Sequence, residues 1–164
     1  MGKAVSLEEL KTIADSLHAQ GKRIVTTNGI FDLLHLGHIR MLETAKQFGD
    51  ILVVGINSDS STKKLKGNLR PVIPQEQRAE MLAAIYCVDY VAIFEETDPS
   101  KFCEIVKPNF HVKSEYEVEK MPETPIVRKY GGEVKIVDFP RQARTTDIFK
   151  KIQEIIKVEQ NGAK

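Results

Sequence analysis

The chain has 164 residues, and its 24 lysines and arginines nearly balance its 23 aspartates and glutamates, giving a formal net charge of +1. This length suffices for one domain with a hydrophobic core of its own, so we expect a single domain over residues 1–164. The balanced charge excludes a nucleic-acid-binding protein that depends on a broad basic surface, although it is compatible with a local basic pocket for phosphates.

The first half of the chain alternates helices with buried strands. A capping box formed by Ser6 and Glu9 precedes apolar residues at helical spacing, which predicts a helix over about 6–20. Residues 23–27 are short, β-branched and apolar, as in a buried strand. After a glycine-containing loop and a second helix, residues 51–57 form a continuous apolar run, which is typical of a parallel strand covered on both faces.

The second half continues the same alternation. Residues 58–70 are polar and basic, which predicts a long loop or a short helix, and Pro74 opens a helix whose apolar side reaches Tyr86. An acidic, irregular segment is expected over 114–124. Further strands are predicted over 90–94, 110–112 and 134–137, and further helices over 99–106, 125–130 and from Thr145 onward.

This order of elements predicts an α/β protein with a Rossmann-like, doubly wound fold. We expect a mainly parallel five-stranded sheet with helices on both faces, because strands that alternate with helices are joined by right-handed crossovers. The core should span about 22–156, followed by a frayed C-terminal tail. Ligands of such sheets collect beyond the carboxyl ends of the strands, so the loop after the first predicted strand is the first place to examine.

Four features of that loop favour an anion such as phosphate. The loop enters a helix whose free N–H groups and positive dipole end attract anions. Gly29 and Gly37 allow close backbone approach to a ligand. His35 and His38 are three residues apart, so that both imidazoles lie on one helix face, and Asp32 is placed to fix the loop or a histidine tautomer.

Two other interpretations of the histidine pair stay open. His35 and His38 could ligate zinc, which requires a third ligand, and Asp32 is the candidate nearby. The pair could also be structural histidines at the surface. Anion binding is favoured by the position of the pair between a strand and a helix, since two histidines at this spacing indicate little by themselves.

The segment Gly29–His38 resembles the GxFDxxHxGH signature of the cytidylyltransferase-like nucleotidyltransferases. The resemblance extends from about Lys22 to Ile156, and within the family the chain is most similar to the nucleotidyltransferase domain of bacterial ADP-heptose synthases. The segments that carry this similarity are Thr27–Gly29, Val54–Asp59, Leu65–Gly67, Arg70–Val72, Gln77–Arg78, Val112–Lys113, Gly131–Val134 and Thr145–Ile148.

The resemblance implies attack of a sugar 1-phosphate on the α-phosphorus of a nucleoside triphosphate, with pyrophosphate leaving. It implies Mg²⁺ bound to the triphosphate without a direct protein ligand, and we expect a homodimer. The implied catalytic residues are His35, His38, Lys66 and Arg78. The implied nucleotide-binding residues are Thr27, Asn28, Gly29, Ile30, Phe31, Asp32, Gly37, His38, Lys113, Arg144, Thr145 and Thr146, and the implied acceptor-binding residues are Asn57, Asp59, Lys64 and Lys66.

Several of these residues also have structural explanations. Lys64 and Lys66 belong to a run of lysines that could form a solvated face. Arg78 could make an i, i+4 ion pair on a helix surface. Thr145 and Thr146 could cap the last helix.

The chain departs from ADP-heptose synthases at two places. Residues 113–116 read Lys-Ser-Glu-Tyr where those enzymes usually carry Lys-Gly-Gly-Asp-Tyr, and residues 143–146 read Ala-Arg-Thr-Thr where relatives often have serine before the two threonines. ATP and a heptose 1-phosphate are the favoured substrates. Glycerol 3-phosphate with CTP is an alternative, and so is a nucleotide-binding module without turnover.

The cysteines and the apolar segments indicate a cytoplasmic protein. Cys87 and Cys103 lie in apolar stretches without CxxC spacing, so we expect two buried, reduced thiols. The N-terminus has no basic region followed by an apolar run, and no apolar stretch approaches the roughly 20 residues that span a bilayer. We therefore expect no membrane partner, and the charge balance argues against a nucleic-acid partner.

Overall fold

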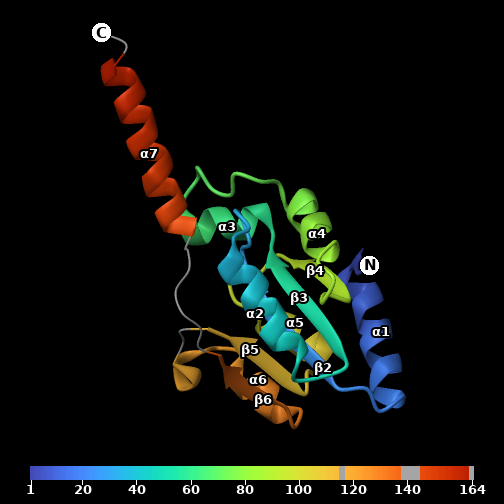
Figure 1. Ribbon diagram of the computed structural model, residues 1–164. Helices are drawn as coiled ribbons and strands as arrows, with labels where there is room; N and C mark the ends of the chain where they lie inside the picture. Colours follow the sequence, from blue (N-terminus) through green and yellow to red (C-terminus); the bar gives the residue numbers. More distant parts are fainter. Residues whose placement is uncertain (115–116, 138–144, 163–164) are drawn as a thin grey trace.

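A computed structural model describes residues 1–114, 117–137 and 145–162 (Figure 1). Six parallel strands form one sheet in the order β1-β4-β3-β2-β5-β6. The strands are β1 (Lys3–Val5), β2 (Ile24–Gly29), β3 (Ile51–Asn57), β4 (Tyr90–Phe94), β5 (Phe110–Lys113) and β6 (Glu133–Ile136).

The helices follow the strands in alternation, as expected. They are α1 (Leu7–Ala19), α2 (Leu36–Lys46), α3 (Asp59–Lys66), α4 (Gln75–Ala83), α5 (Ser100–Val106), α6 (Thr124–Lys129) and α7 (Thr145–Gly162), with a 3-10 turn, η1, at Val118–Lys120. The predicted Rossmann-like α/β fold is confirmed, and so is the capping box, because Ser6 N–H donates to Glu9 Oε2 at 2.8 Å and Glu9 N–H donates to Ser6 Oγ at 3.1 Å.

The sheet has one strand more than predicted. β1 pairs with β4 through three residues only, Lys3 with Tyr90 and the two that follow. A strand this short at the edge of a sheet carries almost no alternation of apolar and polar residues, which is why the sequence pattern did not reveal it. The predicted place of Tyr86 on a helix is also wrong, because α4 ends at Ala83 and the tyrosine is 80% exposed.

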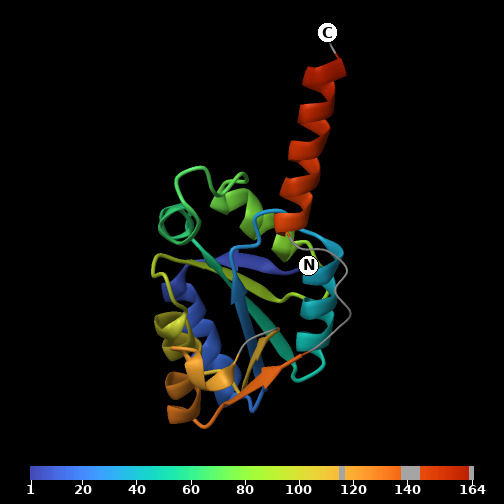
Figure 2. The same ribbon diagram turned by 90° about the vertical axis from the view of Figure 1, so that its left-hand side faces the viewer.

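Two hydrophobic layers cover the sheet. Successive residues of β3 face opposite sides, so that Leu52 and Val54 pack in one layer while Val53 packs in the other. The first layer is closed by α2 and α4, and the second by α1, α5 and α6 (Figure 2). Both cysteines are buried and free, as expected.

The last helix projects from this core. Figures 1 and 2 both show α7 extending away from the sheet and the other helices. The helix runs through Gly162, into the segment for which a frayed tail was expected. Within the described segments, no helix combines the length and the apolar character needed to cross a membrane.

The order of the strands defines where a ligand can enter. From β2 the chain adds β3 and β4 on one side, and then places β5 and β6 on the other side. The crossovers on the two sides lie on opposite faces of the sheet, which leaves a crevice at the carboxyl ends of β2 and β5. The predicted loop leaves β2 at this point.

Candidate functional site

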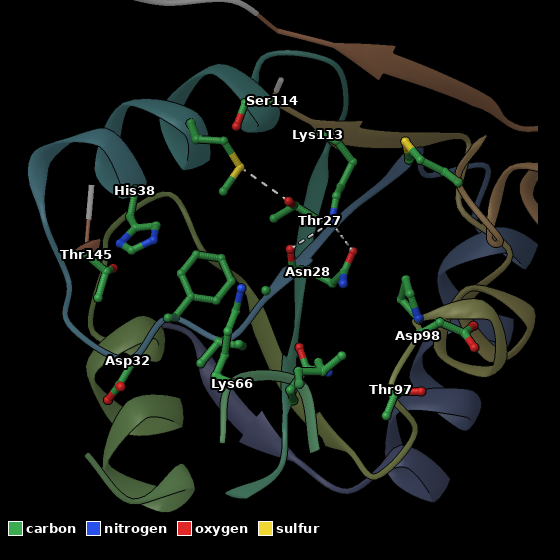
Figure 3. Close-up of a pocket in the computed structure, with 18 of the residues that line it drawn as sticks. Thr27, Asn28, Asp32, His38, Lys66, Thr97, Asp98, Lys113, Ser114 and Thr145 are labelled. Carbon is green, nitrogen blue, oxygen red and sulfur yellow. Dashed lines mark hydrogen bonds between the residues drawn. The ribbon is translucent and has the colours of Figure 1, made fainter. Parts of the chain in front are cut away.

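A pocket of about 800 Å³ opens at the carboxyl ends of β2, β3 and β5 (Figure 3). Its volume is within the range of sites for nucleotides and other small molecules. It brings together predicted residues from several separate segments: Thr27, Asn28, Gly29, Ile30, Phe31, Asp32, His35, Gly37, His38, Asn57, Lys66, Lys113, Thr145 and Thr146.

The histidine pair stands at the start of α2. His35 is the residue that precedes the helix, and the His35 and His38 rings stack with centroids 3.8 Å apart and an interplanar angle of 22°. The Phe31 ring also contacts His38, with ring centroids 5.0 Å apart and an interplanar angle of 52°. The predicted placement of both imidazoles on one face is therefore confirmed.

Both histidines are neutral in the free protein at pH 7. Burial lowers the pKa of His38 to about 4, with a further contribution from His35. Burial also lowers the pKa of His35, which the charge of Asp147 only partly offsets. In the described part of the chain, the Nδ1 atoms of both rings have no hydrogen-bond partner. An anion placed here would gain two donors, because it would favour protonation of the rings.

Asp32 fixes a neighbouring loop. Its Oδ1 accepts hydrogen bonds from the backbone N–H groups of Val72 at 2.8 Å and Ile73 at 3.0 Å, and its Oδ2 accepts one from Arg70 Nε. These contacts anchor Asp32 to residues 70–73, and no hydrogen bond among the described residues joins it to a histidine. Nor does Asp32 complete a zinc site, because no three His, Cys, Asp or Glu side chains among the described residues are placed to hold a metal ion.

Arg78 supports the pocket from behind and does not line it. Its guanidinium is fully buried and donates to the carbonyl oxygens of Ile30, Ile73 and Asn57, and to Asp59 Oδ1 at 2.7 Å. The alternative of a surface ion pair along the helix is therefore wrong. The arginine ties the ends of β2 and β3 to the start of α4, which indicates a positioning role.

Lys113 joins the ends of β5 and β2. Its Nζ donates to the Asn28 backbone oxygen at 3.2 Å and to Asn28 Oδ1 at 2.9 Å (Figure 3). The lysine is 8% exposed, and burial lowers the pKa of its ammonium group. This pair holds a cationic side chain and an amide at the centre of the pocket.

Some predicted residues lie elsewhere. Lys66 lines the pocket, whereas Lys64, two positions earlier on α3, is exposed and does not. Asp59 accepts a hydrogen bond from Arg78 and does not line the pocket either. Arg144 lies outside the described residues.

The pocket also includes residues for which no role was predicted, namely Met41, Leu65, Arg70, Thr97, Asp98, Pro99, Ser114, Lys120, Met121, Pro122 and Glu123. Thr97 and Asp98 follow the carboxyl end of β4, a position that could have marked them as candidates. Glu123 precedes a short helix that is distant from the motif in sequence, and no local pattern singles it out.

The fold and the site together define a class. The parallel sheet has its pocket at the topological switch point. The start of a helix, two histidines, a lysine and two threonines face this cavity. These are the features of a Rossmann-like protein that binds a phosphorylated ligand.

The comparison with known proteins is more specific. The chain belongs to the cytidylyltransferase-like family, whose sequence model matches residues 26–161. The family predicted from the Gly29–His38 motif is thus confirmed.

Relatives extend this similarity over most of the chain. It is 46% identical over 151 residues to the bifunctional protein HldE of Geobacter sulfurreducens, and 46% identical over 147 residues to that of Nitratiruptor. These alignments cover 92% and 89% of this chain, but only 31% of each relative. The chain therefore spans about a third of the length of these curated relatives.

Two solved structures are similar to this chain in fold. A lipopolysaccharide core biosynthesis protein from Thermoplasma volcanium is 32% identical, with a TM-score of 0.60 over 75% of this chain and 100% of its own. A pantoate-β-alanine ligase from Francisella tularensis has a TM-score of 0.61 at 17% identity, covering 96% of this chain and 80% of its own, and shows the fold alone.

Proposed function

We propose that this protein is a nucleotidyltransferase that joins ATP to a heptose 1-phosphate and releases pyrophosphate. The observation that carries the proposal is the convergence of His35, His38, Lys66 and Thr145 on one pocket, although three separate segments supply them. The similarity to HldE proteins and to a lipopolysaccharide core biosynthesis protein favours a heptose as acceptor and ATP as donor. The product would be an ADP-activated heptose for lipopolysaccharide biosynthesis.

The reaction needs no general base. An oxygen of the acceptor phosphate, already anionic at neutral pH, forms a bond to the α-phosphorus, while the bond from that phosphorus to the bridging oxygen of the β-phosphate breaks. The electron pair leaves with pyrophosphate. Catalysis therefore depends on aligning two anions and on placing donors where negative charge accumulates.

The residues of the pocket suit these two tasks. His35 and His38, beside the N–H groups at the start of α2, would contact the triphosphate and stabilise charge on the transferring group. Lys66 would reduce repulsion between the two substrates, and Thr145 would bind a phosphate at the start of α7. Arg78 would act indirectly, by holding the ends of β2 and β3.

Mg²⁺ is expected to enter with the triphosphate. Asp32 is the one carboxylate among the described residues that line the histidine end of the pocket, and both of its oxygens already accept hydrogen bonds. The donors present thus fit a cation that is held by phosphate oxygens and water. Such a cation would neutralise part of the charge of the triphosphate.

A pyrophosphate-release assay tests the proposal. Purified protein is incubated with each nucleoside triphosphate and Mg²⁺ against a panel of heptose 1-phosphate, other sugar 1-phosphates and glycerol 3-phosphate. We expect the highest kcat/KM for ATP with heptose 1-phosphate. Turnover only with CTP and glycerol 3-phosphate would overturn the substrate assignment, and nucleotide binding without release from any pair would overturn the enzymatic one.

We also propose that the protein acts in the cytoplasm as a homodimer. Free, buried cysteines suit a reducing compartment, where ATP is available. The apolar stripe of the projecting helix α7 supports a contact between two copies of the chain.

A further inference from the structure

A buried polar cluster borders the pocket at the end away from the histidine pair. Glu123, at the start of α6, is 3% exposed, and His111 on β5 and Thr26 on β2 are completely buried. Ionisable side chains in such surroundings lose hydration, and that loss must be offset by hydrogen bonds or by opposite charges. Burial of this cluster therefore costs folding free energy, unless contacts within the fold or with a ligand offset the loss of hydration.

One hydrogen bond and one close contact connect the members of this cluster. Thr26 Oγ1 lies 2.8 Å from His111 Nδ1, and His111 Nε2 lies 3.4 Å from Glu123 Oε1. With the proton on Nε2, Nδ1 accepts from the threonine hydroxyl, while Nε2 lies beside the carboxylate and has no hydrogen-bond partner among the described residues. The series Thr26–His111–Glu123 thus runs from the middle of the sheet to the wall of the pocket.

The carboxylate at the end of this chain is charged. Burial by itself would raise the pKa of the Glu123 carboxyl, but the neighbouring His111 ring, a backbone hydrogen bond and the positive charge of Lys113 together lower it. Burial lowers the pKa of His111, so that its imidazole is neutral at pH 7. The pocket wall therefore presents an anion backed by a neutral ring.

Most of the accepting capacity of Glu123 is left for a ligand. Among the described residues, His111 is the one side chain within hydrogen-bonding or ion-pairing distance of its carboxylate. A carboxylate has about four lone-pair sites. Glu123 also lines the pocket, so the unused sites are accessible from the cavity.

The charges at this end select the chemistry of the ligand. Glu123, Asp98 and Lys113 all line the pocket. Thr97 and Asp98 line the cavity on the side opposite His38 and Thr145, with Lys66 between them (Figure 3), and Asp98 Oδ1 accepts a hydrogen bond from the Ser100 backbone N–H at 2.9 Å. Two carboxylates repel phosphate groups but accept hydrogen bonds from hydroxyl groups.

We propose that Glu123 is a specificity-determining residue, whose carboxylate accepts hydrogen bonds from hydroxyl groups of the phosphorylated acceptor. The inference rests on the proposed function, and it divides the pocket into two ends. The triphosphate occupies the end with the histidine pair, and the uncharged, hydroxyl-bearing part of the acceptor occupies the end with Glu123 and Asp98.

Steady-state kinetics of the Glu123→Gln variant test the proposal, because glutamine keeps the shape and removes the charge. With ATP and heptose 1-phosphate, we expect KM for the acceptor to rise about 10- to 100-fold, the scale of one hydrogen bond to a charged group. KM for ATP should stay within about twofold. The matched control is Glu119→Gln, an exposed glutamate of the preceding turn that pairs with Arg128, and it should change neither constant.

Each result has a defined consequence. An equal rise in KM for ATP, as expected if Glu123 binds the base, would overturn the proposal, and so would two unchanged KM values. Failure of the wild-type protein to release pyrophosphate with any acceptor would overturn the proposed function itself, and the assignment of Glu123 would fall with it.

A second experiment does not depend on how well the variant folds. Wild-type KM is measured for heptose 1-phosphate and for a series of its single-deoxy analogues. Loss of the hydroxyl group that contacts Glu123 should raise KM about 10- to 100-fold, the scale of one hydrogen bond to a charged group. If no deoxy analogue binds less tightly than the parent compound, the proposal is wrong.

Discussion

His38 is the residue on which the proposed chemistry depends most directly. It stacks on His35 and contacts the tilted ring of Phe31, and its Nδ1 has no partner among the described residues, so it can donate to a phosphate without losing an internal hydrogen bond. We expect His38→Ala to lower kcat by at least about 100-fold, the scale of losing one preorganised donor.

The control for this variant is His18→Ala. His18 lies on α1 and contacts the Val106 carbonyl oxygen at 3.0 Å, outside the pocket. Its loss should leave kcat unchanged. A kcat within about threefold of wild type in His38→Ala would remove His38 from the mechanism, provided that circular dichroism shows a folded variant.

The lowered pKa of His38 also makes stability depend on pH. The unfolded chain binds a proton at a histidine pKa near 6.5, whereas folded His38 binds one only near pH 4. The unfolded state is therefore favoured as the pH falls from about 6.5 to 4, and the contribution of neutral His38 to stability is fully present above that window. We expect the free energy of unfolding, from urea titrations at pH 7 and pH 5, to fall more in wild type than in His38→Ala. Equal decreases would contradict the buried, neutral state of this ring.

At the scale of elements, Arg78 connects the two strands and the helix that build the pocket. Replacing it by methionine leaves the carboxylate of Asp59 and three backbone carbonyl oxygens without their donor. We expect Arg78→Met to lower the free energy of unfolding by about 3–5 kcal/mol, because several buried carbonyl oxygens lose their donor at a cost of about 1–3 kcal/mol each.

A surface arginine provides the comparison for this variant. Arg128→Met breaks the exposed pair with Glu119 and should cost less than about 1 kcal/mol. Chemical denaturation of both variants measures the difference. A loss below about 1 kcal/mol in Arg78→Met, together with a large drop in kcat, would favour direct contact with substrate over positioning.

The same elements show which parts of the site can be predicted from a sequence. The buried strands and the helix start at His35 follow from local patterns, because apolar runs, glycines and caps act on neighbouring residues. The orientation of the lysines of α3 does not follow from a local pattern. Residues two apart on a helix point about 200° apart, so only one of Lys64 and Lys66 can face the pocket. Since residues 58–70 were equally compatible with a loop, the sequence pattern could not show which of the two lysines faces the pocket.

Tertiary contacts explain the remaining differences. The guanidinium of Arg78 is buried because carbonyl oxygens of three separate segments converge on it, and Glu123 reaches the pocket because α6 packs against β6 and α5. Neither arrangement has a local sequence signal. The sequence therefore indicated the loop that we propose binds the phosphates, and it did not indicate the carboxylate that we assign to the acceptor.

For the whole molecule, the projecting helix α7 is the feature that the domain does not explain by itself. One stripe of the helix consists of Ile148, Phe149, Ile152, Ile155 and Ile156. Ile152, Ile155 and Ile156 are 42%, 48% and 45% exposed. Arg70 covers Phe149 at 4.2 Å from the ring centroid, which ties the base of the helix to the domain. An exposed apolar stripe of this length marks an interaction surface.

The spacing of the stripe favours a second copy of the same chain. Phe149, Ile152 and Ile156 are separated by three and four residues, as in the seam between two paired helices. Pairing would also fix the start of α7, where Thr145 lines the pocket. We expect the wild-type protein to be a dimer and the double variant Ile152→Glu/Ile156→Glu to be a monomer, with a higher KM for ATP.

Light scattering after size-exclusion chromatography measures the mass, and Lys150→Glu, on the opposite side of the helix, should stay dimeric. A monomeric wild type would show that the stripe serves another partner, such as a further domain of the kind that makes the HldE relatives three times as long.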